Sequence, residues 1–167
     1  QAPGSAPWAI ALPAGRRPPA STDVRPLIEE AATREALCAL HGTLPGHALR
    51  VHATRADLRA LLAHLAAIVR HALGTESLPR ALVATQSGQM LLHWAAPEDA
   101  TANHGAACLA SRFMRMASAA VPPASADRAL HGSVHAALAI VHAGGGRLAA
   151  APSTLSPTGL TVRLPLE

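Results

Sequence analysis

The hydrophobic positions of residues 57–73 follow a helical period. Within Asp57–Leu73 the apolar side chains recur three or four residues apart and form one stripe, made by Leu58, Leu61, Leu62, Leu65, Val69 and Ala72. No proline or glycine interrupts the segment before Gly74, which stands where a C-capping glycine ends a helix. The pattern therefore predicts a helix of about four or five turns. Function should be sought on a second line of residues beside the stripe, namely His64, Ala67, Ile68 and His71.

Two further segments have a helical period. The run Ser21-Thr22-Asp23 offers capping side chains, Pro26 suits a first helical turn, and an apolar stripe continues as far as His41. The second segment is Val134–Ala143, which Gly144-Gly145-Gly146 terminates. We therefore expect one helix before the long one and another near the C-terminus.

Short apolar runs predict the strands. Ala81–Thr85 and Met90–Trp94 flank a four-residue turn that contains glycine, a pattern typical of a β-hairpin. Ala48–His52 is a candidate short strand, and Arg147–Ala151 and Leu160–Leu166 are the last two. In the final strand apolar and polar residues alternate, which predicts one buried face and one wet face.

The pattern dissolves between residues 95 and 129. This stretch contains Pro97, Pro122 and Pro123, and its one apolar island, Cys108–Met116, predicts a short helix. A loop of this length inside a compact domain is usually functional or disordered. The whole order of elements predicts an α/β (α+β) fold, a two-layer sandwich in which a mixed, mostly antiparallel sheet is covered on one face by about three helices.

The length of 167 residues suits one domain with a tail. Residues 1–20 are rich in Pro, Ala and Gly and are interpreted as a linker or partly ordered extension, with Trp8–Leu12 as a short edge strand. Residues 21–167 then form the domain.

The composition excludes several classes of function. The net charge is +4, every basic residue is an arginine, and only Trp8, Trp94 and Phe113 are aromatic, so neither clustered cations nor stacking rings favour nucleic-acid binding. Cys38 and Cys108 lie far apart and outside any CxxC motif, which argues against a disulfide scaffold and fits a reducing compartment. No run is long and apolar enough for a membrane span, and the prolines of the first 20 residues argue against a signal peptide. We expect a soluble cytoplasmic segment without membrane contact, which can be a piece of a larger protein.

The last third of the chain resembles a known family. Its segments AIVHAGGGRL and GLTVRLPL are similar to the end of the sensor histidine kinase catalytic domain, whose ATPase fold is shared with gyrase-type and Hsp90-type proteins (GHKL). Arg112–Arg115 (RFMR) is similar to the F-x-R segment before the nucleotide lid, and Thr22–Ala31 resembles the opening segment. The long helix corresponds to the asparagine-box helix, and residues 95–130 stand in the place of the ATP lid. The resemblance covers residues 21–167 and implies a histidine-kinase-like ATPase fold in bacterial two-component signalling.

The nucleotide-binding motifs of that family are missing. His64 can stand for the first polar residue of the asparagine box, but the magnesium ligand falls on Ala67 or Ile68, and neither offers an oxygen to a hard cation. The glycine box aligns with His131–His135, where Ser133 and His135 would keep phosphate from the backbone. The adenine box should follow the hairpin, yet residues 93–100 contain no glycine and no Asp in the chain begins Asp-x-Gly. The degenerate nucleotide pocket is therefore expected at His64, Ile68, Ser133 and His135.

The phosphoacceptor is missing too, because none of the ten histidines is followed by an acidic residue. We expect a degenerate domain without catalytic residues, metal or cofactor, acting as a protein-interaction or regulatory module. The resemblance implies a response regulator or a kinase dimerisation domain as partner, and a homodimer would form through regions outside this segment. The alternative is a divergent but active lobe that binds ATP and Mg and transfers phosphoryl to a histidine of a separate domain. A third interpretation is a plain structural domain fused to a sensor.

Three smaller hypotheses concern the polar side chains. His131 and His135 are four residues apart and could share a metal with His104 or His93, although the third ligand is not identifiable and solvated histidines are the simpler interpretation. Cys108 has His104 nearby, but no orienting acid accompanies them, so burial as a small apolar residue is the default. His64 would be a residual catalytic base only with ATP beside it.

Overall fold

The computed structural model describes residues 20–97, 102–151 and 159–167, with the side chains of residues 102–107 and 151 excepted. The predicted edge strand Trp8–Leu12 lies outside the described residues. The elements in chain order are β1 (Ser21–Asp23), α2 (Arg25–Thr33), β2 (Ala39–Leu40), β3 (Arg50–His52), α3 (Arg55–Leu73), β4 (Arg80–Gln86), β5 (Gln89–Ala95), α4 (Ala102–Ser118), a 3₁₀ turn η1 (Ser125–Asp127), α5 (Arg128–Ala143), β6 (Arg147–Ala151) and β7 (Gly159–Pro165).

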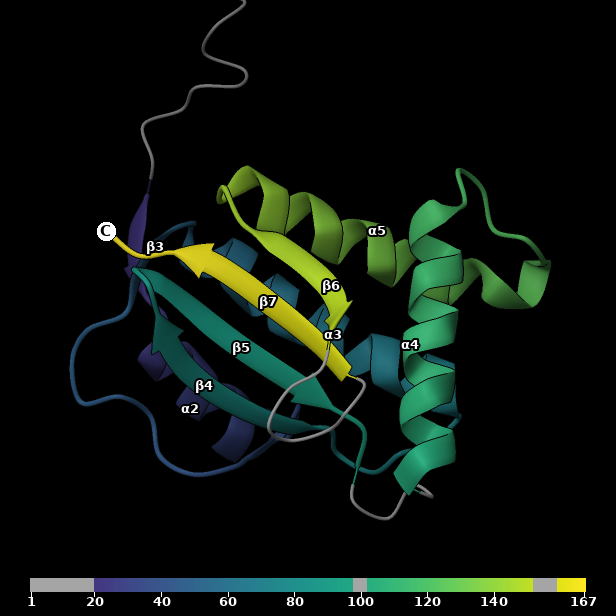
Figure 1. Cartoon of the computed structure of the whole chain (residues 1–167), viewed down its shortest axis with the longest axis horizontal. Coiled ribbons are helices and arrows are strands. Elements are labelled where there is room, and N and C mark those ends of the chain that lie inside the picture. Colours follow the sequence, from purple (N-terminus) through teal and green to yellow (C-terminus); the bar gives the residue numbers. More distant parts are fainter. Residues whose placement is uncertain (1–19, 98–101, 152–158) are drawn as a thin grey trace, which may run out of the picture.

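The main sheet has five strands in the order β2-β4-β5-β7-β6. Only the pairing of β2 with β4 is parallel, and the other neighbours are antiparallel. Helices α2, α3 and α5 lie behind this sheet, no helix of the described residues lies on its opposite face, and α4 stands at one end (Figure 1). β1 and β3 form a separate two-stranded sheet. The predicted two-layer α+β sandwich is confirmed.

The long helix forms as its sequence predicts. The side-chain oxygen of Thr54 accepts a hydrogen bond from the Asp57 N–H, and Gly74 ends the helix with a left-handed φ of 62°. The whole apolar stripe is buried, and so is Ile68 beside it. Burial of this stripe against the sheet and the neighbouring helices stabilises α3 more than its intrinsic propensity does.

Three sequence predictions were wrong in detail. The first helix ends at Thr33 instead of continuing to His41, because the chain turns through Ala36 (φ 50°) and enters β2, which hydrogen-bonds to β4. Ser21–Asp23 is a strand paired with β3, so it is not only a cap. The stretch expected to be a long loop with a short helix at Cys108–Met116 contains the 17-residue helix α4, which is longer than predicted because its apolar face finds a surface to cover.

The last helix is also longer than predicted. It begins at Arg128, so the residues aligned with a glycine box lie inside the helix instead of in a loop. The reason is visible in the spacing of Leu130, Val134, Ala137 and Val141, all buried on one face. No helix in the described part of the chain is long and apolar enough to cross a bilayer.

Candidate functional site

Helix α4 packs across the groove between α3, α5 and the sheet. Its side chains Leu109, Phe113 and Met116 are 0%, 3% and 1% exposed and belong to the same hydrophobic cluster as residues of both helices. The helix contacts α3, α5, β6 and β7. Helix α4, which is the described helical part of the segment predicted to replace a nucleotide lid, is therefore packed into the core.

The two predicted pocket positions on α3 differ in their surroundings. Ile68 is fully buried in the core cluster, whereas His64 is partly exposed. Beside them, Ala67 is partly exposed and His71 is exposed. The second line of the helix thus runs from the core at Ile68 to the solvent at His71.

The other two predicted positions, Ser133 and His135, lie on α5, which packs against α3. Ser133 is partly exposed. His135 Nε2 lies 2.9 Å from the carbonyl oxygen of Met116 and 3.1 Å from that of Ala119, and His131 Nε2 lies 2.8 Å from the Ala119 oxygen. The two imidazole rings are 4.2 Å apart. Because these carbonyls belong to the last turn of α4 and the residue after it, the two histidines cap that helix and fasten it to α5.

An arginine fastens α4 at a second point. One Arg112 guanidinium nitrogen donates to the carbonyl of Ala72 near the end of α3 at 3.1 Å, and the other lies 3.4 Å from the Asp127 carboxylate. Asp127 is 8% exposed. The sequence marks Arg112 only through the RFMR segment, and nothing in it singles out Asp127.

The end of β5 offers no carboxylate in the described residues. Trp94 is fully buried, and Ala96 after the strand presents a methyl group. Its carbonyl already accepts a hydrogen bond from Arg80 Nε at 2.9 Å. Residues 98–100 of the segment where the adenine box was sought lie outside the described residues.

Close packing and backbone conformation explain why three glycines follow α5. A Cβ on Gly146 would collide with the carbonyl oxygen of Arg163 in β7, and one on Gly144 would press on Leu164 and the His52 carbonyl. Gly145 has a φ of 78°. The motif that most resembles the kinase family is thus needed to join α5 to β6 against β7, whether or not a nucleotide binds.

The smaller hypotheses find little support. Among the described residues, no three His, Cys, Asp or Glu side chains are grouped so that they could hold a metal. His93 lies on β5, where its Nδ1 is 3.3 Å from the Thr161 hydroxyl, and the side chain of His104 is outside the described residues. Cys38 is buried, and this burial raises the pKa of its thiol to about 11, which makes it unreactive. Cys108 is partly buried, with its sulfur 3.9 Å from the Ala72 carbonyl.

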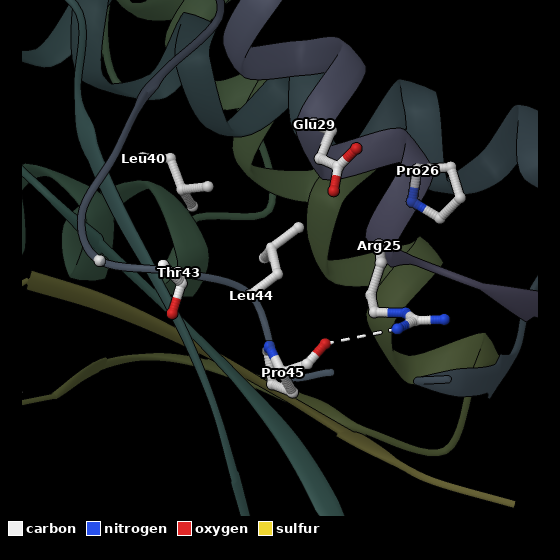
Figure 2. Close-up of a pocket in the computed structure, with 8 residues that line it drawn as sticks. Arg25, Pro26, Glu29, Leu40, Thr43, Leu44 and Pro45 are labelled. Carbon is white, nitrogen blue, oxygen red and sulfur yellow. Dashed lines mark hydrogen bonds between the residues drawn. The ribbon is translucent and has the colours of Figure 1, made fainter. Parts of the chain in front are cut away.

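A cavity of about 610 Å³ lies on the other side of the molecule, beside α2. Figure 2 shows its walls, which are the first turns of α2 on one side and the loop after β2 on the other, with Arg25, Pro26, Glu29, Leu40, Gly42, Thr43, Leu44 and Pro45 as lining residues. It is an open groove, and none of its lining residues is at a nucleotide position implied by the resemblance.

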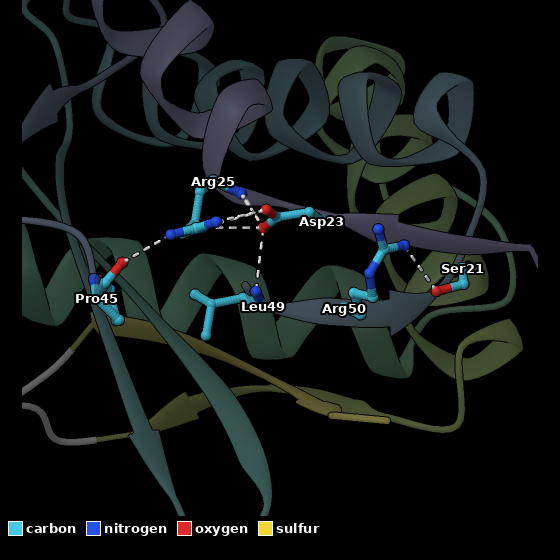
Figure 3. A network of polar contacts seen from close by, with 6 residues as sticks. All are labelled: Ser21, Asp23, Arg25, Pro45, Leu49 and Arg50. Carbon is cyan, nitrogen blue, oxygen red and sulfur yellow. Dashed lines mark hydrogen bonds and ion pairs between the residues drawn. The ribbon is translucent and has the colours of Figure 1, made fainter. Parts of the chain in front are cut away.

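A polar network borders this groove (Figure 3). The Asp23 carboxylate accepts hydrogen bonds from the Arg25 guanidinium, at 2.9 Å for the shortest, and from the Leu49 N–H at 3.0 Å. Arg25 also donates to the Pro45 carbonyl at 3.4 Å. The Arg25 hydrogen bonds and the two backbone donors lower the pKa of Asp23 to about 2 against the opposing effect of desolvation. The network ties β1 and α2 to the loop before β3, which is a structural role.

No family model matches the chain, and no curated protein matches it. Among the solved structures that are similar to it are two histidine kinases. A mycobacterial sensor histidine kinase, MprB, aligns with 15% identity and a TM-score of 0.48 over 89% of this chain and 98% of that one. The Acinetobacter baumannii histidine kinase AdeS aligns with 15% identity and a TM-score of 0.47 over 91% of this chain and 69% of that one.

Proposed function

We propose that the chain is a degenerate histidine-kinase-like ATPase domain of a bacterial two-component signalling protein, which does not bind ATP and acts as a protein-interaction or regulatory module. The motif resemblance from Thr22 to Leu166 supports the family, and the residues at the nucleotide positions support the loss of binding.

The observation that carries the proposal is the packing of α4. Leu109, Phe113 and Met116 fill the groove between α3, α5 and the sheet, and Ile68 belongs to the same core cluster. Burying one side chain of this size contributes about 1.5–3 kcal/mol, so exposing all three would cost about 5–9 kcal/mol. A ligand of micromolar affinity releases only about 8 kcal/mol on binding. A nucleotide that had to displace α4 in order to bind would therefore lose most of its binding energy.

The fastenings of α4 add to this cost. Arg112 bonds to the end of α3, and His131 and His135 bond to the last carbonyls of α4. Each such hydrogen bond contributes about 0.5–1.5 kcal/mol in a folded protein. With α4 held in place, the surface of the module would keep one shape. A partner such as a response regulator or a kinase dimerisation domain would bind to that surface.

Thermal unfolding with and without ADP or a non-hydrolysable ATP analogue plus magnesium tests the proposal. A ligand at 100 times its dissociation constant adds about 2.7 kcal/mol of stability. We expect no shift of the midpoint, while an active histidine kinase ATPase domain run in parallel shifts. A nucleotide-dependent rise would overturn the proposal in favour of a divergent, active ATP-binding lobe.

A further inference from the structure

The five strands of the main sheet contain no Asp or Glu. They contain four basic or titratable side chains instead, namely Arg80, His93, Arg147 and Arg163. The residues next to them in each strand, such as Ala81, Leu92, Leu148 and Val162, belong to the core. Because side chains alternate along a strand, all four project from the face that no helix covers (Figure 1).

Two of these arginines are direct neighbours. Arg147 of β6 pairs with Arg163 of β7 in the antiparallel register, and both are exposed. Residues that face each other in this way have Cα atoms about 4.5–5.5 Å apart, and like charges there are destabilising. Among the described residues neither guanidinium forms an ion pair, since the arginines that do are Arg25, Arg59 and Arg112.

The positive charge of Arg163 also affects the neighbouring histidine, His93. Burial lowers the pKa of His93, and the charge of Arg163 lowers it further. Its Nδ1 is already within hydrogen-bond reach of Thr161 on β7. The open face therefore has uncompensated positive charge around the middle of β7 and no carboxylate in its own strands to offset it.

The surroundings of the arginine pair favour protein over nucleic acid. On this face the side chains near the cations are small or apolar. Ala149 is exposed, whereas Leu91 and Thr161 are buried at 5% and 4% exposed, so the exposed contact points are the two arginines. The aromatic side chains Trp94 and Phe113 lie in the core, so in the described residues no ring is free to stack on a base. Two adjacent guanidiniums match a carboxylate, which accepts parallel hydrogen bonds from such forks.

We propose that the open face of the sheet docks an acidic segment of a partner protein, with a carboxylate of that segment held between Arg147 and Arg163. The inference rests on the proposed function, a module that acts by protein contact, and it names the surface and the chemistry of the partner. The charge of the face complements such a segment, and binding would relieve the repulsion between the two arginines.

The test is a selection of random peptides displayed on phage against the full chain, followed by synthesis and titration of the enriched sequences. We expect enriched peptides to contain several Asp or Glu residues among apolar ones. In the Arg147→Gln/Arg163→Gln variant their dissociation constants should rise about tenfold or more, because a bound charge pair is lost. Arg147→Lys/Arg163→Lys should recover only part of the affinity, since lysine lacks the planar fork.

The matched control is Arg70→Gln/Arg128→Gln, which removes the same charge from exposed positions on α3 and α5. We expect its dissociation constants to stay within about twofold of the unaltered chain, as for charges away from the contact. Equal losses in both double variants, enrichment of non-acidic peptides, or no enrichment would overturn the inference. So would an oligodeoxythymidine that competes with the peptides on this face.

A second measurement does not depend on the variants folding. Amide chemical shifts of the unaltered, isotope-labelled chain should change in β6 and β7 when the peptide is added, and changes confined to other elements would overturn the inference. Stabilisation by magnesium and ADP would overturn the proposed function whatever the peptides do. Failure of the peptide experiments alone would overturn only this assignment of the surface.

Discussion

Asp23 is held in its charged form by its surroundings. Its carboxylate accepts hydrogen bonds from the Arg25 guanidinium and from the N–H groups of Leu49 and Arg25, and the pKa falls from the ordinary 3.8 to about 2. A carboxyl group whose pKa is depressed in the folded state stabilises that state above its ordinary pKa. The contribution is therefore fully present at neutral pH and is lost as the pH falls from about 4 towards 2.

The prediction is that Arg25→Gln raises the pKa of Asp23, because the hydrogen bonds from the Arg25 guanidinium, which are the largest cause of the low pKa, are removed. Carbon-detected NMR titration of the Asp23 carboxyl measures it directly. Arg70→Gln, at the far end of α3, serves as the control and should leave the titration unchanged. An Asp23 that titrates near 3.8 in the unaltered chain would show that the network seen in Figure 3 is not formed in solution.

At the scale of elements, α4 depends on a few buried side chains. Phe113 is 3% exposed and sits in the core cluster, whereas its neighbour Met114 is 61% exposed. We expect Phe113→Ala to lower the free energy of unfolding by about 3–5 kcal/mol through lost burial and the cavity left behind. Urea denaturation followed by circular dichroism gives the value.

Met114→Ala is the matched control for this helix. It shortens a side chain of the same helix on the solvent side, so its effect should stay within about 0.5 kcal/mol. If Phe113→Ala were as mild as the control, α4 would not be part of the core, and the groove between α3, α5 and the sheet would be open to a ligand.

The elements differ in how far the sequence predicts them. α3 has an uninterrupted stripe, a capping Thr54 and a terminating Gly74, so local signals and packing agree. β2 is only two residues long, and its conformation depends on the hydrogen bonds that Ala39 and His41 donate to the Pro79 and Ala81 carbonyls. A pairing of that kind depends on residues forty positions away and leaves almost no local signal.

The helices around the candidate site show a different difficulty. The spacing of Leu109, Phe113 and Met116 is helical, and so is that of Leu130, Val134 and Val141, yet both helices extend beyond their predicted bounds. Many alanines and nearby prolines weaken the first signal. The sequence shows His131 and His135 only as two histidines four residues apart. It does not predict that they cap α4, because the carbonyls that they contact belong to the end of α4 and the residue after it.

At the scale of the whole molecule, the positions that the resemblance aligns with nucleotide-binding residues are linked through packing. Ile68 in α3, the buried face of α4 and the cap that α5 places on α4 all belong to one packed arrangement. Under the proposed function, a change at one of these positions would leave α4 in place and would not restore nucleotide binding. The resemblance puts the magnesium ligand at or beside Ile68, which makes this residue the place to test that coupling.

We predict that Ile68→Asn destabilises the chain without restoring nucleotide binding. The amide would be buried among hydrocarbon side chains, and an unsatisfied buried polar group together with the lost burial costs about 3 kcal/mol or more. Ile68→Val, which removes one methyl group and adds no polar atom, should cost about 0.5–1.5 kcal/mol. Thermal unfolding of the unaltered chain and both variants, each with and without magnesium and ADP, separates the two effects. The contrary outcome is an unfolding midpoint that rises with nucleotide for Ile68→Asn but not for Ile68→Val. It would mean that the groove opens readily, and that binding is prevented by the loss of one side-chain oxygen and not by the packing of α4.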